Sequence, residues 1–315
     1  MKALFYGTPA VAVPYLELLA RRAELVAVVT QPDRPAGRGL ELRPSPVKAK
    51  ALELGLAVLQ PEKPSEIVAR LAGLKPDLAV VVAYGRILKR DALLVPRLGS
   101  LNVHFSLLPR YRGAAPVQWS LIRGETKTGV TLFWLDEGMD TGPVFLQREQ
   151  AIDPEDDART LMEKLQALGV VLLGEALDEI EAGRLPRREQ SGEPSAAPLL
   201  RSLDARLEVD RPAIELHNRV RGLALGPKPY LELRAGAGLT RLIVLKTKIG
   251  AGPGDEKAPP GAILRVDPGA GFLLKCRTSC LWLLSVQPEG KKPVTAANFL
   301  NGLRLGAGDF LPLCL

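Results

Sequence analysis

Residues 99–104 read Gly-Ser-Leu-Asn-Val-His and form one of five short apolar runs in the N-terminal half of the chain. The other four expected strands are Ala3–Tyr6, Leu25–Thr30, Leu78–Ala83 and Thr128–Trp134. Longer amphipathic stretches separate these runs. This alternation is typical of βαβ units, so it predicts an α/β fold, a Rossmann-like and mostly parallel sheet with helices on both faces.

Helices are expected between these strands and after the last of them. Pro14 and Pro46 lie where a helix can begin, because proline suits the first helical turn. At the end of this half, leucines recur with the three-to-four spacing of one buried helical face. The four expected helices are Tyr15–Arg22, Ser45–Leu54, Lys89–Val95 and Asp156–Ala182.

The composition changes after the last of these helices. Residues 183–203 are polar and carry three prolines, which is linker composition. Beyond them, a helix is expected over Arg211–Leu223, followed by short apolar strands, among them Leu242–Lys246, which Gly- and Pro-rich turns separate. This pattern predicts a small OB-like β-barrel, or else a sandwich. We therefore predict domains over residues 1–183 and 207–315, joined by a linker over 184–206.

The charge is distributed unevenly along the chain. Residues 1–206 carry 27 basic and 26 acidic side chains, whereas residues 207–315 carry 15 basic and 9 acidic ones. A basic segment can bind a polyanion, most commonly nucleic acid, by releasing counterions. A solvated basic surface explains the charge equally well, so charge alone leaves both interpretations open.

The composition also bears on location and on metals. No apolar run approaches the roughly 20 residues that a membrane span needs, and no secretory signal is evident. We therefore expect a cytoplasmic protein that does not bind membranes, and we expect a monomer. The chain has three cysteines and two histidines, which form no four-ligand zinc pattern, so we expect no metal.

Polar residues at the carboxyl ends of strands mark the ligand-binding edge of such a sheet. Asn102 and His104 point to the same face of an extended strand. Asp140 follows the strand that ends at Trp134, in a glycine-containing loop that can fold close to a ligand. Taken singly, each residue is more often structural, because histidines pack at strand ends and Asn or Asp favour turns. We expect the loop to bring Asp140 beside His104.

The chain lacks the glycine-rich loops of dinucleotide and triphosphate sites after its first strand. Residues 102–145 instead carry Asn-x-His, Ser-Leu-Leu-Pro and Asp-Thr-Gly-Pro elements in this order, and this combination resembles the folate-dependent formyltransferases. The resemblance implies 10-formyltetrahydrofolate as the co-substrate, and Asn102, His104 and Asp140 as catalytic residues. It also implies a set of folate-binding residues: Arg86, Leu88, Ser106, Leu107, Leu108 and Pro109.

Two further segments resemble the members of that family that formylate initiator methionyl-tRNA. They are Thr-Gln-Pro-Asp-Arg-Pro-Ala-Gly-Arg-Gly at residues 30–39 and Arg-Tyr-Arg-Gly-Ala-Ala-Pro at residues 110–116. The resemblance implies that the first segment reaches the acceptor stem of the tRNA through Arg38, and that residues 207–315 form a tRNA-binding domain. It departs from the family pattern at Glu208-Val209, at residues 225–228, and at Phe105, where a smaller residue is expected.

The expected reaction is acyl transfer. An amine attacks the formyl carbon, an oxyanion forms, and the folate nitrogen leaves with a proton. We expect the Asn102 amide and a protonated His104 to donate to the oxyanion, while Asp140 orients His104, raises its pKa and relays a proton.

Two alternatives remain open. The same chemistry could act on a nucleotide-linked amino sugar or a ribonucleotide amine, or the chain could be a non-catalytic RNA-binding protein.

Overall fold

The structure is a computed structural model, and it describes residues 1–36, 41–236, 238–250 and 257–314. The chain divides into two compact units. The first comprises Met1–Gly113, Thr128–Ala151 and Glu163–Ala196, and the second comprises Ala114–Lys127, Ile152–Met162 and Ala197–Leu315. Each unit is therefore assembled from separated segments of the sequence, while the predicted boundaries at residues 183 and 206 stay predictions.

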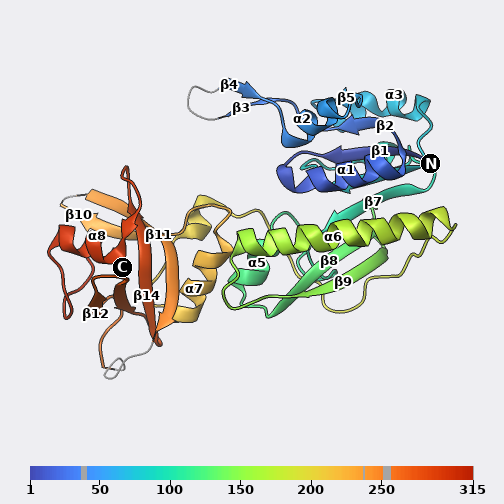
Figure 1. The fold of residues 1–315 in the computed structure, drawn as a ribbon. Helices are drawn as coiled ribbons and strands as arrows, with labels where there is room; N and C mark the ends of the chain where they lie inside the picture. The colour runs from blue at the N-terminus through green and yellow to red at the C-terminus, as the bar shows by residue number, and fades with distance from the viewer. Residues whose placement is uncertain (37–40, 237, 251–256, 315) are drawn as a thin grey trace. The chain divides into compact units, whose positions relative to one another are not determined.

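The first unit is built on a seven-stranded sheet in the order β5-β2-β1-β6-β7-β8-β9 (Figure 1). Neighbouring strands from β5 to β7 are parallel, and β8 runs antiparallel to β7. The prediction of a mostly parallel sheet is confirmed. The strands are β1 Lys2–Gly7, β2 Glu24–Val29, β5 Val58–Leu59, β6 Leu78–Val82, β7 Gly99–His104, β8 Lys127–Trp134 and β9 Val144–Ala151.

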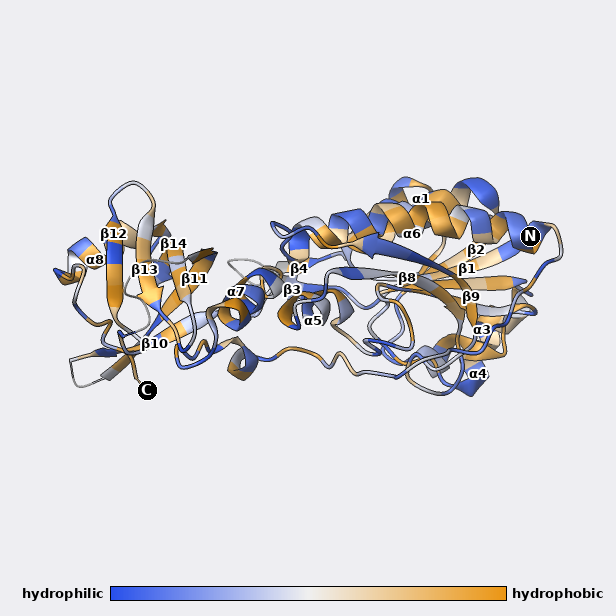
Figure 2. Ribbon diagram, turned by 90° about the horizontal axis from the view of Figure 1, so that it is seen from below, coloured by the Kyte–Doolittle hydropathy of each residue, from blue (hydrophilic) through white to orange (hydrophobic). Residues whose placement is uncertain are grey.

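Helices cover both faces of this sheet, as predicted. Helices α1 (Val13–Arg22) and α6 (Ala158–Glu181) lie on one face, and α3 (Val68–Gly73) and α4 (Arg90–Leu93) lie on the other (Figure 2). The sheet between them is rich in apolar side chains, which are buried by this arrangement.

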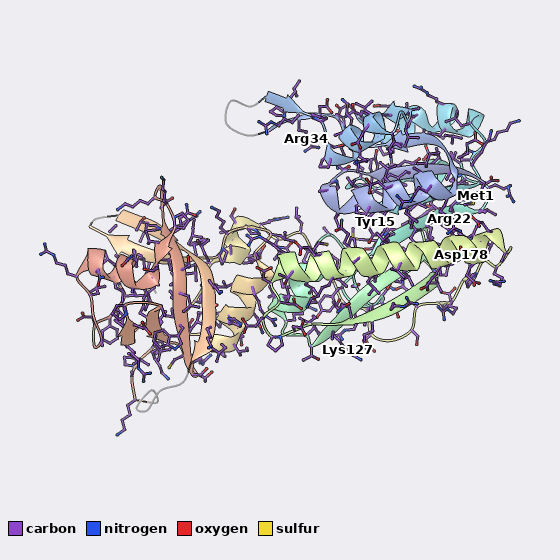
Figure 3. The ribbon with its side chains drawn as sticks, in the orientation of Figure 1. Met1, Tyr15, Arg22, Arg34, Lys127 and Asp178 are labelled. Carbon is purple, nitrogen blue, oxygen red and sulfur yellow. The ribbon has the colours of Figure 1, made fainter. Side chains whose placement is uncertain are left out.

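Two contacts tie α1 to α6. The Tyr15 hydroxyl donates to the carbonyl oxygen of Gln166 at 3.1 Å. Arg22 and Asp178, at the ends of the two helices, form an ion pair at 2.6 Å (Figure 3). Together these contacts hold the two helices side by side over the sheet.

Shorter elements complete the first unit. Helix α2 begins at Pro46, and the Ser45 hydroxyl caps it by accepting from the backbone N–H of Lys48 at 3.0 Å. The remaining elements are α2 Pro46–Glu53, the 3-10 helices η1 Ala10–Ala12 and η2 Pro64–Ile67, and the antiparallel pair β3 Arg34–Ala36 and β4 Glu41–Arg43.

The second unit contains an antiparallel sheet in the order β10-β11-β14-β13-β12, with β15 paired to β14. One apolar cluster that includes Leu242, Phe272 and Leu300 fills its core. The predicted C-terminal antiparallel β domain is confirmed. Its elements are η3 Ser202–Ala205, α7 Ala213–Gly222, β10 Tyr230–Ala235, β11 Gly238–Gly250, β12 Ile263–Asp267, β13 Gly271–Lys275, β14 Cys280–Pro288, β15 Val294–Thr295 and α8 Ala296–Leu303.

Helix α5 (Pro116–Ile122) also belongs to the second unit, although it lies between two strands of the first in sequence. It contacts α7, and the Gln118 amide donates to the Gly226 carbonyl at 2.6 Å. Among the described residues, no helix combines the length and hydropathy that crossing a membrane requires.

Candidate active site

Strand β7 presents Asn102 and His104 on one face of the sheet. Its pairing with β8 is regular, with Asn102 opposite Phe133 and His104 opposite Thr131, so the two side chains share a face. Asn102 is half-buried, and its carboxamide makes no hydrogen bond to another described residue. The Asn102 amide is therefore available to a ligand.

His104 is held between a backbone carbonyl and a carboxylate. Its Nε2 atom lies 2.9 Å from the carbonyl oxygen of Tyr111, and its Nδ1 atom lies 3.6 Å from Oδ2 of Asp140. A carbonyl only accepts, so Nε2 carries the hydrogen of this bond. The distance of 3.6 Å is too long for a hydrogen bond. The structure thus brings His104 and Asp140 together and leaves a gap between their facing atoms.

The backbone around Asp140 explains how its carboxylate reaches this place. Asp140 has a φ of +55°, a left-handed conformation that costs a residue with a side chain about 1 kcal/mol. The Gly113 N–H donates to Oδ2 of Asp140 at 2.7 Å. This charge-assisted bond holds the carboxylate toward His104.

Burial dominates the protonation of His104. His104 is 6% exposed. Burial lowers the pKa of His104 below its ordinary value, and this effect outweighs the Asp140 carboxylate and the Tyr111 carbonyl, which raise the pKa. The expectation that Asp140 raises the pKa of His104 describes one contribution correctly, but the net direction is down. At neutral pH the imidazole of the free protein is therefore uncharged.

The Ser106–Pro109 turn is fixed by internal hydrogen bonds. The Ser106 hydroxyl donates to the Arg110 carbonyl at 2.6 Å. The Thr131 hydroxyl donates to the Ser106 carbonyl at 2.6 Å, and the Leu108 N–H donates to Thr131 Oγ1 at 3.2 Å. The Ser106 hydroxyl therefore stabilises the conformation of the turn. Leu107 is half-buried and Pro109 is buried.

The other residues that the resemblance implies lie in different surroundings. Leu88 is 7% exposed and packs in the apolar cluster that includes Tyr84 and Ala92. Arg86 lies 3.4 Å from Glu62, and its Nε is buried without a hydrogen-bond partner among the described residues. Arg38 lies outside the described residues.

Phe105 packs away from the Asn102 and His104 face. Its ring meets the buried Tyr15 of α1 edge-on, at 6.4 Å between centroids. The larger side chain at this position is therefore accommodated under α1 rather than beside His104.

A cavity of about 720 Å³ opens beside the loop that carries Asp140. It is lined by Leu93 of α4, Ser100 of β7, and Leu135 and Asp136 after β8, among other residues. The Ser100 hydroxyl is buried without a hydrogen-bond partner among the described residues. A volume of this size is within the range of small-molecule sites. The part of the chain that the structure describes has no group of three His, Cys, Asp or Glu side chains able to hold a metal ion.

Sequence reasoning missed two backbone groups that complete the site, the Tyr111 carbonyl and the Gly113 amide. The sequence linked residues 110–116 only to a family resemblance. Backbone groups are present at every position, so no residue type could have marked these two.

Comparison with known families defines the class of protein. A family model described as formyl transferase matches residues 10–177, and one described as the formyl transferase C-terminal domain matches residues 200–304. Asn102, His104 and Asp140 lie within the first match. The chain is an enzyme of the formyl transferase class.

The chain belongs to the methionyl-tRNA formyltransferase family. It is 43% identical to the methionyl-tRNA formyltransferase of Elusimicrobium minutum over 99% of this chain and 99% of the relative. It is 44% identical to that of Sorangium cellulosum, again over 99% of both chains. The family predicted from the resemblance is thus confirmed over the full chain.

Solved structures with lower identity share the fold. HypX from Aquifex aeolicus in complex with tetrahydrofolic acid has a TM-score of 0.64 and 17% identity, covering 98% of this chain and 48% of that chain, so this chain spans about half of HypX. The N-formyltransferase from Helicobacter canadensis in complex with folinic acid and dTDP-3-aminofucose has a TM-score of 0.66 and 20% identity, covering 90% of this chain and 99% of that chain.

Proposed function

We propose that the chain transfers the formyl group of 10-formyltetrahydrofolate to the amino group of initiator methionyl-tRNA, with Asn102, His104 and Asp140 as the catalytic residues. The observation that carries the proposal is the 3.6 Å distance between His104 Nδ1 and Asp140 Oδ2, on the face of β7 that also carries Asn102. The family that the chain belongs to supports the choice of donor and acceptor.

The His104–Asp140 pair is the proton acceptor. The Nε2–H bond to Tyr111 leaves the lone pair of the neutral imidazole on Nδ1, facing the carboxylate. Nδ1 accepts a proton from the attacking amine and then donates a hydrogen bond to Oδ2 of Asp140. The Asp140 carboxylate stabilises the resulting imidazolium. General-base catalysis of this kind contributes about 10²–10⁴ in rate.

The same proton completes the reaction. The amine nitrogen forms a bond to the formyl carbon, and the bond from that carbon to the folate nitrogen breaks. The proton taken up by the pair passes to the leaving folate nitrogen, so protons balance without a covalent enzyme intermediate. His104 starts neutral in this sequence and carries charge only after attack.

Asn102 stabilises the tetrahedral intermediate. Its carboxamide has no hydrogen-bond partner among the residues that the structure describes, and it lies on the His104 face of β7. One donor aimed at a developing oxyanion contributes about 3 kcal/mol.

The donor binds along the first unit. The ordered Ser106–Pro109 turn and the backbone near Arg86 and Leu88 support the pterin. The cavity beside Asp136 offers both apolar and charged side chains, and a Ser100 hydroxyl that has no hydrogen-bond partner among the described residues.

The acceptor is recognised by positive charge. Arg38 contacts the acceptor stem, and the second unit binds the tRNA backbone. Exposed Arg241, Lys246 and Lys248 on β11 illustrate the basic character of that unit. Such contacts release counterions, so binding weakens with salt. We retain the expectation of a monomeric, cytoplasmic enzyme.

Acceptor choice tests the proposal. The purified chain is incubated with 10-formyltetrahydrofolate and one of three amines: methionyl-initiator-tRNA, a dTDP-linked amino sugar or a ribonucleotide amine. We expect formyl-methionyl-tRNA and at least a hundredfold slower reaction with the other two. Preferential formylation of a small acceptor would overturn the proposed substrate, and tRNA binding without any formyl transfer would support a non-catalytic RNA-binding protein.

A further inference from the structure

Gln190 lies in the polar segment after α6, and its carboxamide contacts two loops at once. Its Nε2 donates to the backbone carbonyls of Asp140 and Gly142, at 2.8 and 2.9 Å. Its Oε1 accepts from Nε and Nη2 of Arg112, at 3.2 and 2.6 Å. A carboxamide offers two donor hydrogens and two acceptor lone pairs, so every one of them is used.

The two loops joined by Gln190 are those that hold the catalytic pair. One contains Asp140. The other contains Arg112, between Tyr111, whose carbonyl binds His104, and Gly113, whose N–H binds the Asp140 carboxylate. Gln190 thus links the loop that contains Asp140 to the loop that contains Arg112, and the second loop binds both His104 and Asp140. Gln190 therefore constrains the distance between the two loops.

The chain on both sides of Gln190 is anchored to the same unit. Before it, Arg188 exchanges backbone hydrogen bonds with Val144 at 2.7 and 3.0 Å. After it, the Ser195 hydroxyl accepts from the Tyr111 N–H at 2.9 Å. The segment whose composition is that of a linker is therefore bound to the catalytic sheet around Gln190.

The Asp140 backbone adopts an uncommon conformation. Its φ of +55° lies in a region that residues other than glycine rarely adopt. The carbonyl that Gln190 binds belongs to Asp140 itself, so the bond fixes the peptide plane directly after the left-handed residue.

We propose that Gln190 is a positioning residue for formyl transfer, whose carboxamide fixes the Asp140 carboxylate against the His104 imidazole. This inference rests on the proposed function, since it concerns the pair to which proton transfer is ascribed. Gln190 acts through Asp140 and needs no contact with either substrate.

Three variants separate this role from a general effect on folding. Gln190→Leu removes all four hydrogen bonds at similar volume. Gln190→Glu keeps an acceptor for Arg112 but sets a carboxylate against two carbonyl oxygens. Gln150→Leu is the matched control, because Gln150 is also half-buried in the first unit and its amide bonds only the neighbouring Ala151 carbonyl at 3.1 Å.

The titration of His104 gives a readout that needs no activity. The chain has only two histidines, His104 and His217, so their imidazole NMR signals are separable. Because Asp140 raises the pKa of His104 against burial, retreat of Asp140 lowers that pKa further. The groups near His104 are the Asp140 carboxylate, the Tyr111 carbonyl, the Phe133 ring on β8, and Arg110 and Arg112 beside Tyr111.

The experiment measures the pKa of His104 and the single-turnover rate of formyl transfer in wild type and in Asp140→Asn, each with and without Gln190→Leu. We expect Gln190→Leu to lower the pKa of His104 and to slow transfer at least tenfold in wild type. In Asp140→Asn it should leave the pKa unchanged and slow transfer less than threefold, because the group it positions is gone. His217 should titrate normally throughout, and Gln150→Leu should behave as wild type.

An unchanged His104 pKa with a rate within twofold of wild type would overturn the inference. Equal slowing in both Asp140 backgrounds would also overturn it, since Gln190 would then act independently of Asp140. If Gln190→Leu does not fold, Gln190→Glu is measured in the same way. A wild-type protein that fails to formylate methionyl-tRNA would refute the proposed function instead, and the His104 titration would still decide the positioning role.

Discussion

Nδ1 of His104 faces Oδ2 of Asp140 at 3.6 Å, and the backbone of residues 111–113 forms hydrogen bonds to both side chains. The Tyr111 carbonyl holds the far nitrogen of the imidazole, and the Gly113 amide holds the near oxygen of the carboxylate. To form a hydrogen bond, the pair needs a proton on Nδ1 and an approach of the two atoms to hydrogen-bonding distance. A pair of this kind accepts a proton without moving either side chain far, which suits attack by an amine.

The rate should depend on pH through His104. Because burial sets the pKa of His104 below its ordinary value of about 6.5, the base form persists into mildly acidic solution. We expect kcat/KM for methionyl-tRNA to show an additional decline, caused by protonation of His104, only below pH 6.5. His104→Gln should abolish that decline and leave the decline that belongs to the amine of the acceptor. An identical acidic profile in His104→Gln would show that another group is the base.

Stability should also carry the signature of a buried neutral histidine. The unfolded chain takes up a proton at His104 near pH 6.5, whereas the folded chain does so only at lower pH, so the free energy of unfolding falls as the pH drops below about 6.5. His104→Gln should weaken this fall relative to wild type, as measured by urea unfolding between pH 5 and 8. His217, whose pKa is also lowered by burial, contributes to the slope in both proteins. Identical slopes would contradict the burial of a neutral His104.

Gly142 is required by a close backbone approach. A Cβ atom at Gly142 would lie 1.8 Å from the carbonyl oxygen of Trp134, so Gly142→Ala must displace the loop that carries Asp140. We expect unfolding to become easier by about 1–3 kcal/mol and formyl transfer to slow by at least tenfold. The control is Gly174→Ala in α6, where a Cβ meets no atom within 4 Å and where alanine favours the helix by up to about 1 kcal/mol. Equal activity and stability of Gly142→Ala and wild type would refute the tight loop.

Arg38 should affect the acceptor alone. Arg38→Ala is expected to raise the KM for methionyl-tRNA about tenfold and to reduce the salt dependence of tRNA binding by roughly one counterion. Affinity for the folate donor, measured by fluorescence quenching, should stay within twofold of wild type. Similar losses for tRNA and folate would refute a separate tRNA contact.

Much of the first unit is predictable from sequence because its elements follow strong local patterns. Strand β7 spans the predicted residues 99–104, and α6 lies within two residues of its predicted bounds at both ends. An apolar run and a leucine stripe determine both elements locally.

Other elements depend on tertiary contacts that leave weak local signals. Strand β9 lies at a sheet edge, and most of its residues after Phe145 are not buried, so no alternating apolar pattern marks it. Strand β11 extends from Gly238 to Gly250, well beyond the predicted Leu242–Lys246. Its ends pair with neighbouring strands, but their apolar residues Leu239 and Ile249 are isolated among polar and glycine residues.

The site shows the same division. The proposed site residues Asn102, His104 and Asp140 have distinctive side chains, and strand periodicity places the first two on one face. The Gly113 amide and Gln190 reach Asp140 across 27 and 50 residues of sequence, and Gln190 sits in a segment of linker composition. Contacts that join distant backbone groups leave no periodic signal, so they become visible only in the structure.

The central claim is tested most directly by the single-turnover rate of formyl transfer from 10-formyltetrahydrofolate to methionyl-initiator-tRNA in wild type, His104→Ala and Asp140→Asn. Asp178→Asn, a surface carboxylate paired with Arg22, is the matched control. We predict that His104→Ala and Asp140→Asn each lower the rate at least a hundredfold in folded protein, while Asp178→Asn stays within twofold of wild type. Rates within tenfold of wild type in both site variants would contradict the account.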